Sequence, residues 1–218
     1  MVYPSNYHLP HDPIRSIALI NTNISTDAYC SLDIPHSDIS AIRLSGDFSS
    51  CSIFNIYNDC TNNNTIHTLN TFLHVEPQSA LPSPSDCMIS AGDFNCHHPL
   101  WESDTNHHLL SPPTLLDPLL DLLTEFDMIQ ALPPGLPTLE TPNQNWTQPD
   151  NFWHTITPHN LIIACNTDPS CRPPKADHLP IITDLDLTIT RAEAKERRNM
   201  RLVDYKKLNE KLSDILNT

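Results

Sequence analysis

The amino-acid sequence predicts an α+β fold, in which helices pack against a β-sheet. Strand-like apolar segments stand both before and after two longer segments with helical spacing, which is the pattern of a sheet covered by helices. The chain has 218 residues, of which 39% are hydrophobic, so one sizeable core is expected. Its 21 prolines and three glycines predict many stiff loops with few positions of positive φ.

The first half of the chain contains three segments that are typical of strands. They are 14–20, 39–44 and 51–57. Gly46 and Asp47 form a turn signal between the last two segments, which are therefore expected to pair as a hairpin. A helix is expected at 61–75, because apolar residues recur there at helical spacing after an Asn-rich start.

The second half begins with a short buried strand at 88–91, and its clearest helix is expected at 111–126. Ser111 can cap that helix, proline suits its first turn, and its leucines form a broad apolar face. Four further strands are expected. They are 128–132, 136–139, 160–164 and 179–187.

The C-terminal segment has a different character from the rest of the chain. Thr190 and Glu193 form a capping box, which predicts an amphipathic helix that runs to about Leu216. The chain is therefore expected to divide into one domain at 1–189 and a charged helix within 190–218.

The charge is distributed unevenly between these two parts. Residues 1–189 hold four basic and 21 acidic residues, a formal charge of −17, whereas residues 190–218 hold eight basic and five acidic residues, a charge of +3. Non-specific affinity for DNA comes from Lys and Arg side chains that displace phosphate counterions. The acidic domain therefore disfavours DNA as a partner, and the apolar stripe of the C-terminal helix favours a protein partner.

The cysteines and the N-terminal residues indicate in which cellular compartment the protein is expected. Seven cysteines without Cys-x-x-Cys spacing, and no basic region followed by an apolar run at the start, indicate reduced thiols and an intracellular protein, nuclear if it acts on DNA. No stretch of 18 apolar residues exists, so a membrane partner is not expected.

Two motifs place acids and imidazoles next to expected strands. In the first, an apolar run leads into Gly-Asp-Phe-Asn at 92–95, and two histidines follow. In the second, Asp177 and His178 stand just before the last strand. A buried strand delivers such residues to the rim of a sheet, so the two motifs are expected to converge on one metal ion and one phosphate.

Together these motifs resemble the endonuclease/exonuclease/phosphatase superfamily, in which "GDFN" and "SDH" end two central strands. The extension "NCHHPLWE" at 95–102 is most similar to the endonuclease domain of non-LTR retrotransposons, especially of the fungal type. Segments 53–59, 145–151 and 172–174 extend the resemblance over almost the whole chain. It implies a four-layer α/β sandwich of the DNase I-like type, with two sheets face to face and helices outside.

The resemblance implies a metal-dependent DNA endonuclease, in which water attacks phosphorus in line. The cofactor would be Mg²⁺ (or Mn²⁺), which prefers carboxylate ligands, and the resemblance assigns metal contacts to Asp177 and Asp93. In retrotransposon proteins a helix like that at 190–216 leads from the nuclease toward a reverse transcriptase.

The resemblance also implies five catalytic residues. Asp93 would activate or position the attacking water, and Asn95 would hold a phosphate oxygen. His178 would bind the reacting phosphate, while a carboxylate, best matched by Asp150, would orient its ring. Tyr57 would face the phosphate from the end of its strand.

Other interpretations of these residues stay open. Asp150 also suits a proline-rich turn, and Tyr57 also suits a plain strand aromatic. Cys96 and the histidine pairs at 97–98 and 107–108 suggest zinc, but they do not meet the paired spacing of zinc sites.

The sequence departs from the superfamily at its start. The Asn-bearing first strand and the metal-binding Glu of "QE" are not found, so we expect an N-terminally truncated domain that is weakly active or inactive as a nuclease. Whether the chain is an enzyme therefore stays open. The alternatives are a non-catalytic protein-interaction module and a superfamily phosphoesterase that acts on small substrates.

Overall fold

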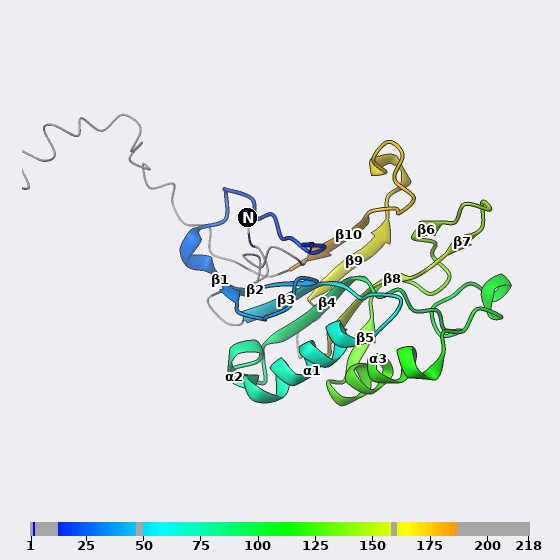
Figure 1. Ribbon diagram of the computed structural model, residues 1–218. Coiled ribbons are helices and arrows are strands. Elements are labelled where there is room, and N and C mark those ends of the chain that lie inside the picture. The colour runs from blue at the N-terminus through cyan, green and yellow to red at the C-terminus, as the bar shows by residue number, and fades with distance from the viewer. Residues whose placement is uncertain (1, 3–12, 47–49, 158–160, 187–218) are drawn as a thin grey trace, which may run out of the picture.

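A six-stranded mixed β-sheet runs through the middle of the molecule (Figure 1). The computed structural model describes residues 2, 13–46, 50–157 and 161–186. The strands of this main sheet lie in the order β1-β2-β3-β4-β8-β5. They are β1 (Tyr29–Leu32), β2 (Ile39–Ser45), β3 (Ser50–Tyr57), β4 (Cys87–Asp93), β8 (Asp150–Thr155) and β5 (Met128–Gln130).

The directions of the strands follow from their connections. β2 and β3 pair antiparallel as the expected hairpin, with Ile39 opposite Ile56. β3 and β4 are parallel, because the chain returns between them through the helices α1 (Asn64–Val75) and α2 (Pro77–Ala80). β8 lies antiparallel to both β4 and β5. The C-terminal end of β4 therefore meets the N-terminal end of β8.

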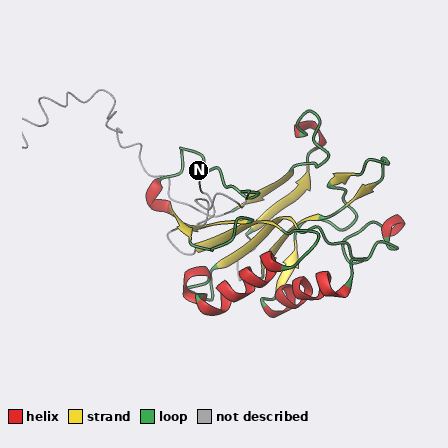
Figure 2. Cartoon of the chain, in the orientation of Figure 1, coloured by secondary structure: helices red, strands yellow, loops and turns green. Residues whose placement is uncertain are grey.

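Helices cover one face of the main sheet (Figures 1 and 2). These are α1, α2 and α3 (Pro113–Glu125), the last of which has proline in its first turn. The buried residues of α1 and α3 recur three and four positions apart, as an amphipathic helix requires. They pack with Phe54, Met88 and Trp153 of the sheet into the larger core.

The opposite face carries a smaller core and a second, two-stranded sheet. Strands β9 (Ile162–Thr167) and β10 (Ile181–Leu185) pair antiparallel, and their inner residues pack over Cys51, Ile89 and Phe152. The described residues thus form three layers, namely helices, main sheet and small sheet. A separate hairpin joins β6 (Leu139–Glu140) to β7 (Trp146–Thr147).

Short 3₁₀ turns complete the described elements. They are η1 (Thr26–Ala28), η2 (Asp104–Asn106) and η3 (Pro169–Cys171). Nowhere in the described ranges is there a helix with the length and apolar character that crossing a bilayer requires.

Several expected elements are confirmed, and others are wrong. The strands at 39–44, 51–57, 88–91 and 128–132 and the helices at 61–75 and 111–126 are present, with shifted ends. The strand expected at 14–20 is wrong, because only Ala18 forms an isolated bridge, to Val2. Of the strand expected at 136–139, only Leu139 lies in a strand.

The last part of the chain is only partly described. β9 and β10 match the strands expected at 160–164 and 179–187, whose outermost residues lie outside the described residues. The C-terminal helix at 190–216, and with it the boundary at 189, also lies outside them. β1, β7 and β8 were not predicted from the sequence.

Candidate active site

Three of the predicted site residues lie side by side at one end of the main sheet. In the parallel β3–β4 pair Tyr57 is the partner of Asp93, and in the antiparallel β4–β8 pair Asp93 is the partner of Asp150. Side chains alternate between the two faces of a strand, and Asp93 shares the face of Ile89, as Asp150 shares that of Phe152. The row therefore lies on the face away from the helices.

Gly92 allows β3 and β4 to approach closely just before Asp93. Its φ of 137° lies in a region that other residues rarely adopt, and a Cβ atom there would lie 2.0 Å from the carbonyl oxygen of Ile56. Asn95 follows with a φ of 50°, and its backbone N–H donates to Asp93 Oδ1 at 3.0 Å. The tight turn after β4 thus holds the Asp93 carboxylate at the rim.

The Asp93 carboxylate lies in an environment that disfavours its charge. Burial, and after it the negative charge of Asp150, raises the pKa of Asp93 to about 6. The backbone N–H of Asn95 and the charges of His178 and His97 act in the opposite direction. Near neutral pH Asp93 is therefore a base of useful strength.

Asn95 contacts the carboxylate that it follows. Its amide Nδ2 donates to Asp93 Oδ2 at 3.2 Å and to the backbone oxygen of Asn58 at 2.8 Å. The resemblance assigns Asn95 to a phosphate oxygen, whereas in this structure its amide hydrogens fix Asp93 and the end of β3.

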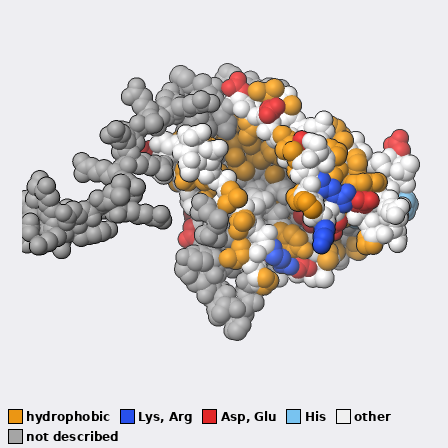
Figure 3. All heavy atoms as spheres, turned by 90° about the horizontal axis from the view of Figure 1, so that it is seen from above, with side chains coloured by type: hydrophobic (Ala, Val, Ile, Leu, Met, Phe, Trp, Pro, Cys, Tyr) orange, Lys and Arg blue, Asp and Glu red, His pale blue; other side chains and the backbone are white. Residues whose placement is uncertain are grey.

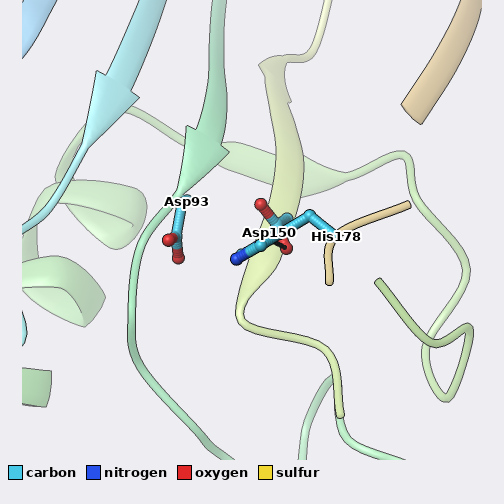
Figure 4. A group of neighbouring side chains, drawn as sticks. All are labelled: Asp93, Asp150 and His178. Atoms are coloured by element: carbon cyan, nitrogen blue, oxygen red, sulfur yellow. Dashed lines mark hydrogen bonds and ion pairs between the residues drawn. The ribbon is translucent and has the colours of Figure 1, made fainter. Parts of the chain in front are cut away.

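His178 joins this row from the loop before β10. Its Nδ1 lies 2.9 Å from Asp150 Oδ2, and its side chain is 38% exposed (Figure 4). The hydrogen bond to Asp150, with the charges of Asp150, Asp93 and Asp177, raises the pKa of His178 to about 9 against the effect of burial. The ring is therefore a cation at neutral pH, and both of its nitrogens then carry a hydrogen.

Asp93, Asp150 and His178 form one cluster. They offer ligand atoms that all lie within 4.8 Å of one another, and no other such group of three or more occurs in the described part of the chain. Figure 4 shows the three side chains gathered at the ends of β4 and β8. The donor set fits a hard divalent cation through its two carboxylates, whereas a protonated imidazole is no ligand.

Asp177, the other predicted metal ligand, lies beside this cluster and not in it. It is exposed, its backbone oxygen accepts a hydrogen bond from the backbone N–H of Glu140 at 2.9 Å, and its charge contributes to the raised pKa of His178. The structure thus brings together Asp93, Asp150 and His178, and it leaves Asp177 to act on the cluster through its charge.

Tyr57 lies beneath an arginine that sequence reasoning missed. The guanidinium carbon of Arg15 lies 4.6 Å from the centre of the Tyr57 ring. Arg15 also donates to Asp38 at 2.7 Å and to Asp59 at 2.8 Å, and these carboxylates raise its pKa. No sequence signal links Arg15 to these partners, because they come together only through the fold.

A second imidazole–carboxylate couple stands in the loop after β4. His97 Nδ1 lies 2.6 Å from Glu102 Oε1, and Glu102 is only 3% exposed. The loop turns around Trp101, which is fully buried and donates from its indole N–H to the backbone oxygen of Cys96 at 3.1 Å. A signal for the couple is present in "HHPLWE", where an acid follows a large apolar residue that the loop must bury.

An open hollow of about 640 Å³ lies next to this loop, on the side of the β6–β7 hairpin. Amide, imidazole and carboxylate groups line much of it, among them Glu102, Asn106, His108, Asn143, Gln144 and Gln148. Basic side chains are few on the face seen in Figure 3, and they lie next to acidic ones. The described part of that face is therefore not strongly cationic.

The mixed sheet, its helical layer and the acid–imidazole cluster define a protein of the DNase I-like, endonuclease/exonuclease/phosphatase fold, and solved structures agree. The endonuclease domain of TRAS1, a telomere-specific non-LTR retrotransposon, matches with a TM-score of 0.58 and 14% identity, over 73% of this chain and 67% of that one. The 3′–5′ exonuclease NExo from Neisseria meningitidis matches with a TM-score of 0.53 and 13% identity, over 70% and 66%.

A third match is the AP endonuclease LMAP from Leishmania major, with a TM-score of 0.52 and 14% identity, over 76% of this chain and 58% of that one. At such identities the likeness concerns the fold alone. The chain spans between 58% and 67% of the length of these three structures. None of the curated protein sequences matches the chain.

The sequence family is narrower than the fold. The model of the endonuclease-reverse transcriptase family matches residues 51–214, which is more than half of the chain. The chain therefore belongs to the endonuclease-reverse transcriptase family.

Proposed function

We propose that this chain is the nuclease module of an endonuclease-reverse transcriptase and hydrolyses a phosphodiester bond of DNA at the cluster of Asp93, Asp150 and His178. The observation that carries the proposal is the strand register, which aligns Asp93 with Asp150 and lets His178 reach Asp150. It puts a base of pKa about 6 next to a cationic imidazole, and these two groups can serve phosphoryl transfer as general base and as stabiliser of phosphate charge.

We assign a role in hydrolysis to each residue according to its charge. Asp93 accepts the proton of the attacking water, and Asn95 keeps its carboxylate in position. The imidazolium of His178 donates a hydrogen bond to a phosphate oxygen through Nε2, since its Nδ1 is bound to Asp150. Tyr57, in register with Asp93, borders the same space from β3.

A divalent ion, Mg²⁺ or Mn²⁺, fits next to these groups. The carboxylates of Asp93 and Asp150 would hold it, and it would neutralise charge on the phosphate oxygens. Two carboxylates are few for such an ion, and His178 as a cation repels it. We therefore propose weak metal affinity and low activity, with Asp177 as a further ligand only if its exposed side chain turns toward the cluster.

The finer architecture and origin are part of the same proposal. We propose descent from a fungal-type non-LTR retrotransposon and a fourth layer, of helix, over the outer face of β9–β10. The exposed side chains of Ile163 and Ile182, 68% and 47% accessible, support such a cover, because that layer would bury them. Action on chromosomal DNA would place the protein in the nucleus.

A plasmid-nicking assay tests the proposed activity. In several millimolar Mg²⁺ or Mn²⁺, supercoiled plasmid should be nicked slowly by the wild type, and Asp93→Ala should reduce the rate by at least about 100-fold. Asp121→Ala, at an exposed position of α3, is the matched control and should act like the wild type. Equal rates for the wild type and Asp93→Ala in both metals would refute the proposal.

The second candidate is a non-catalytic interaction module, and the charges of the domain favour it. Two of its four basic residues are neutralised within the fold, Arg15 by Asp38 and Asp59, and Arg172 by Glu140 at 2.6 Å. Binding to a labelled DNA duplex over a range of salt concentrations separates the candidates. A steep loss of affinity with salt indicates a nucleic-acid role, and no binding indicates a protein partner.

A phosphoesterase of small substrates is the remaining alternative. Release of nitrophenol from p-nitrophenyl phosphate, without any nicking of plasmid, would indicate that activity. Loss of the release in Asp93→Ala would then assign it to the same cluster.

A further inference from the structure

The couple of His97 and Glu102 repeats the construction of the couple of His178 and Asp150. In both, a carboxylate oxygen contacts Nδ1 of the ring, at 2.6 Å for His97 and 2.9 Å for His178. Both rings are partly exposed, 30% for His97 and 38% for His178. A carboxylate on Nδ1 fixes the orientation of an imidazole and leaves Nε2 for a ligand.

Both imidazoles act on Asp93. His97 is close enough for its charge to stabilise ionised Asp93, as the charge of His178 does. The backbone of His97 is fixed at the start of α3, since it receives a hydrogen bond from Ser111 Oγ at 2.9 Å and gives its oxygen to the Ser111 N–H at 2.9 Å. The ring therefore has a fixed place near the cluster.

Glu102 connects this couple to the strand that carries Asp150. The backbone N–H of Gln148, two residues before Asp150, donates to both carboxylate oxygens, at 3.2 and 3.3 Å. The amide of Asn106 donates to Oε2 at 3.2 Å. A buried carboxylate is costly unless it is paired and hydrogen-bonded, and here every contact fixes its position.

The remaining nitrogen of His97 has no partner within the described ranges. A residue that only stabilised the loop could donate a neutral hydrogen bond to Glu102 and would not need a partly exposed ring. Glu102 accepts a hydrogen bond from Nδ1 of His97. If Nε2 also donates to a phosphate oxygen, the ring carries a positive charge. It then lies between two anions, which stabilise that charge. Within the described ranges two of the four basic side chains are paired with acids, Arg15 and Arg172, which favours imidazoles for binding phosphate at this rim.

We infer that His97 binds the phosphate next to the one bound by His178, and that Glu102 is the positioning residue that orients its ring. The inference rests on the proposed function, because a nucleic-acid strand presents one phosphate per nucleotide and a site for one phosphate lies next to its neighbours. His97 would thus help to place the strand, and a substrate with two adjacent phosphates would bind more tightly than one with a single phosphate.

Nuclear magnetic resonance of the histidine rings tests this without catalysis. The full chain is titrated with thymidine 3′,5′-bisphosphate in the presence of a chelator, and the Nε2 signals are assigned with His97→Gln and His178→Gln. Both signals are expected to move, and Glu102→Gln should weaken the response of His97 about tenfold while that of His178 persists. His98→Gln is the matched control: its ring contacts Trp101, at 5.2 Å between ring centres, and both responses should persist.

The outcomes of this titration separate the inference about His97 from the proposed phosphate site at His178. Movement of His178 without movement of His97 overturns this inference and leaves the proposed site in place. If neither ring responds, the inference and the proposed phosphate site fail together. Circular dichroism of Glu102→Gln shows whether its fold is intact, and His97→Gln, at a more exposed position, gives a second measurement: its affinity for the bisphosphate should fall toward that for thymidine 5′-monophosphate. An unchanged affinity contradicts the inference.

Discussion

The two faces of the main sheet do different work. On the helical face, leucines of α1 and α3 pack with Phe54, Met88 and Trp153 into the larger core. On the opposite face a smaller core ends at Tyr57, Asp93 and Asp150, where the charge of Asp150 adds to burial in raising the pKa of Asp93. The larger core thus lies on one face and the candidate active site at the rim of the other, so substitutions can separate stability from the proposed activity.

The largest loss of stability is expected at Gly92, where the backbones of β3 and β4 approach each other closely. In Gly92→Ala the new Cβ would lie 2.0 Å from the oxygen of Ile56, at a φ of 137°, so β3 and β4 must separate. We expect a loss of about 4 kcal/mol or more in the free energy of unfolding, measured by urea denaturation.

Gly135→Ala is the matched control for this prediction. Its φ of 78° is also positive, but the nearest atom to a Cβ lies at 3.4 Å, so a loss of only about 1 kcal/mol is expected. Similar losses at Gly92 and Gly135 would show that the close approach of β3 to β4 does not limit stability.

A pair of leucines compares the two cores directly. Leu119 on α3 and Leu132 after β5 both have 0% exposure, the first in the larger core and the second in the smaller one. Leu119→Ala should cost about 4 kcal/mol and Leu132→Ala about 2–3 kcal/mol, because a smaller core collapses more readily around a cavity. Urea denaturation gives both values, and a greater cost at Leu132 would reverse the comparison.

What the sequence could predict depends on apolar periodicity and not on the face of the sheet, since β9 and β10 on the opposite face were predicted as well. The elements of the helical face, α1, α3, β3 and β4, were predicted because apolar periodicity marks them. β8 was missed, although it is central, because its Asp150-Asn151-Phe152-Trp153-His154-Thr155 mixes polar and apolar residues. Buried Asn151 is accommodated by the side chains of Gln130 and Gln148, and local sequence does not reveal those partners.

For the site, the motifs indicated residues and the fold supplied their partners. Asp93, Asp150 and His178 were named from the resemblance, and the register of β8 brings them together. Arg15 and Glu102 were not named, because their partners lie far along the chain or depend on how a loop buries Trp101. Asp177 was assigned to the metal, but it lies outside the cluster, because the loop before β10 leaves it exposed.

A smaller effect is expected at Asp93, where a substitution should increase stability while it abolishes the proposed activity. Its folded pKa of about 6 is above the ordinary value of 3.8, so its ionisation destabilises the fold as pH rises from about 4 to 6. Asp93→Asn should therefore raise the free energy of unfolding at pH 8 by about 1–3 kcal/mol and abolish nicking.

Urea denaturation at pH 4 and pH 8 checks this prediction. Most of the gain should disappear at pH 4, where the acid is neutral in the folded chain and only about half ionised in the unfolded chain. Asp121→Asn, at an exposed position on the helical side, should change neither value. A loss of stability at pH 8 in Asp93→Asn would mean that the carboxylate is needed for the fold.

The smallest effect is expected at His178, where stability is also lost as pH rises, but over a higher range of pH than at Asp93. Its folded pKa of about 9 is above the ordinary value of 6.5, so its charge stabilises the fold fully below pH 6.5 and no longer does so above about pH 9. The ring is 38% exposed and solvent screens it, so we expect a difference of only about 1 kcal/mol between the wild type and His178→Gln at pH 6. Urea denaturation from pH 6 to 10 should show that difference fading.

His98 provides the contrast, because burial lowers its pKa, and its contribution to stability is instead lost as pH falls. A difference at His178 that stays constant to pH 10 would mean that its contact with Asp150 does not depend on the ring's charge, and the imidazolium assigned to phosphate binding would then lose its support.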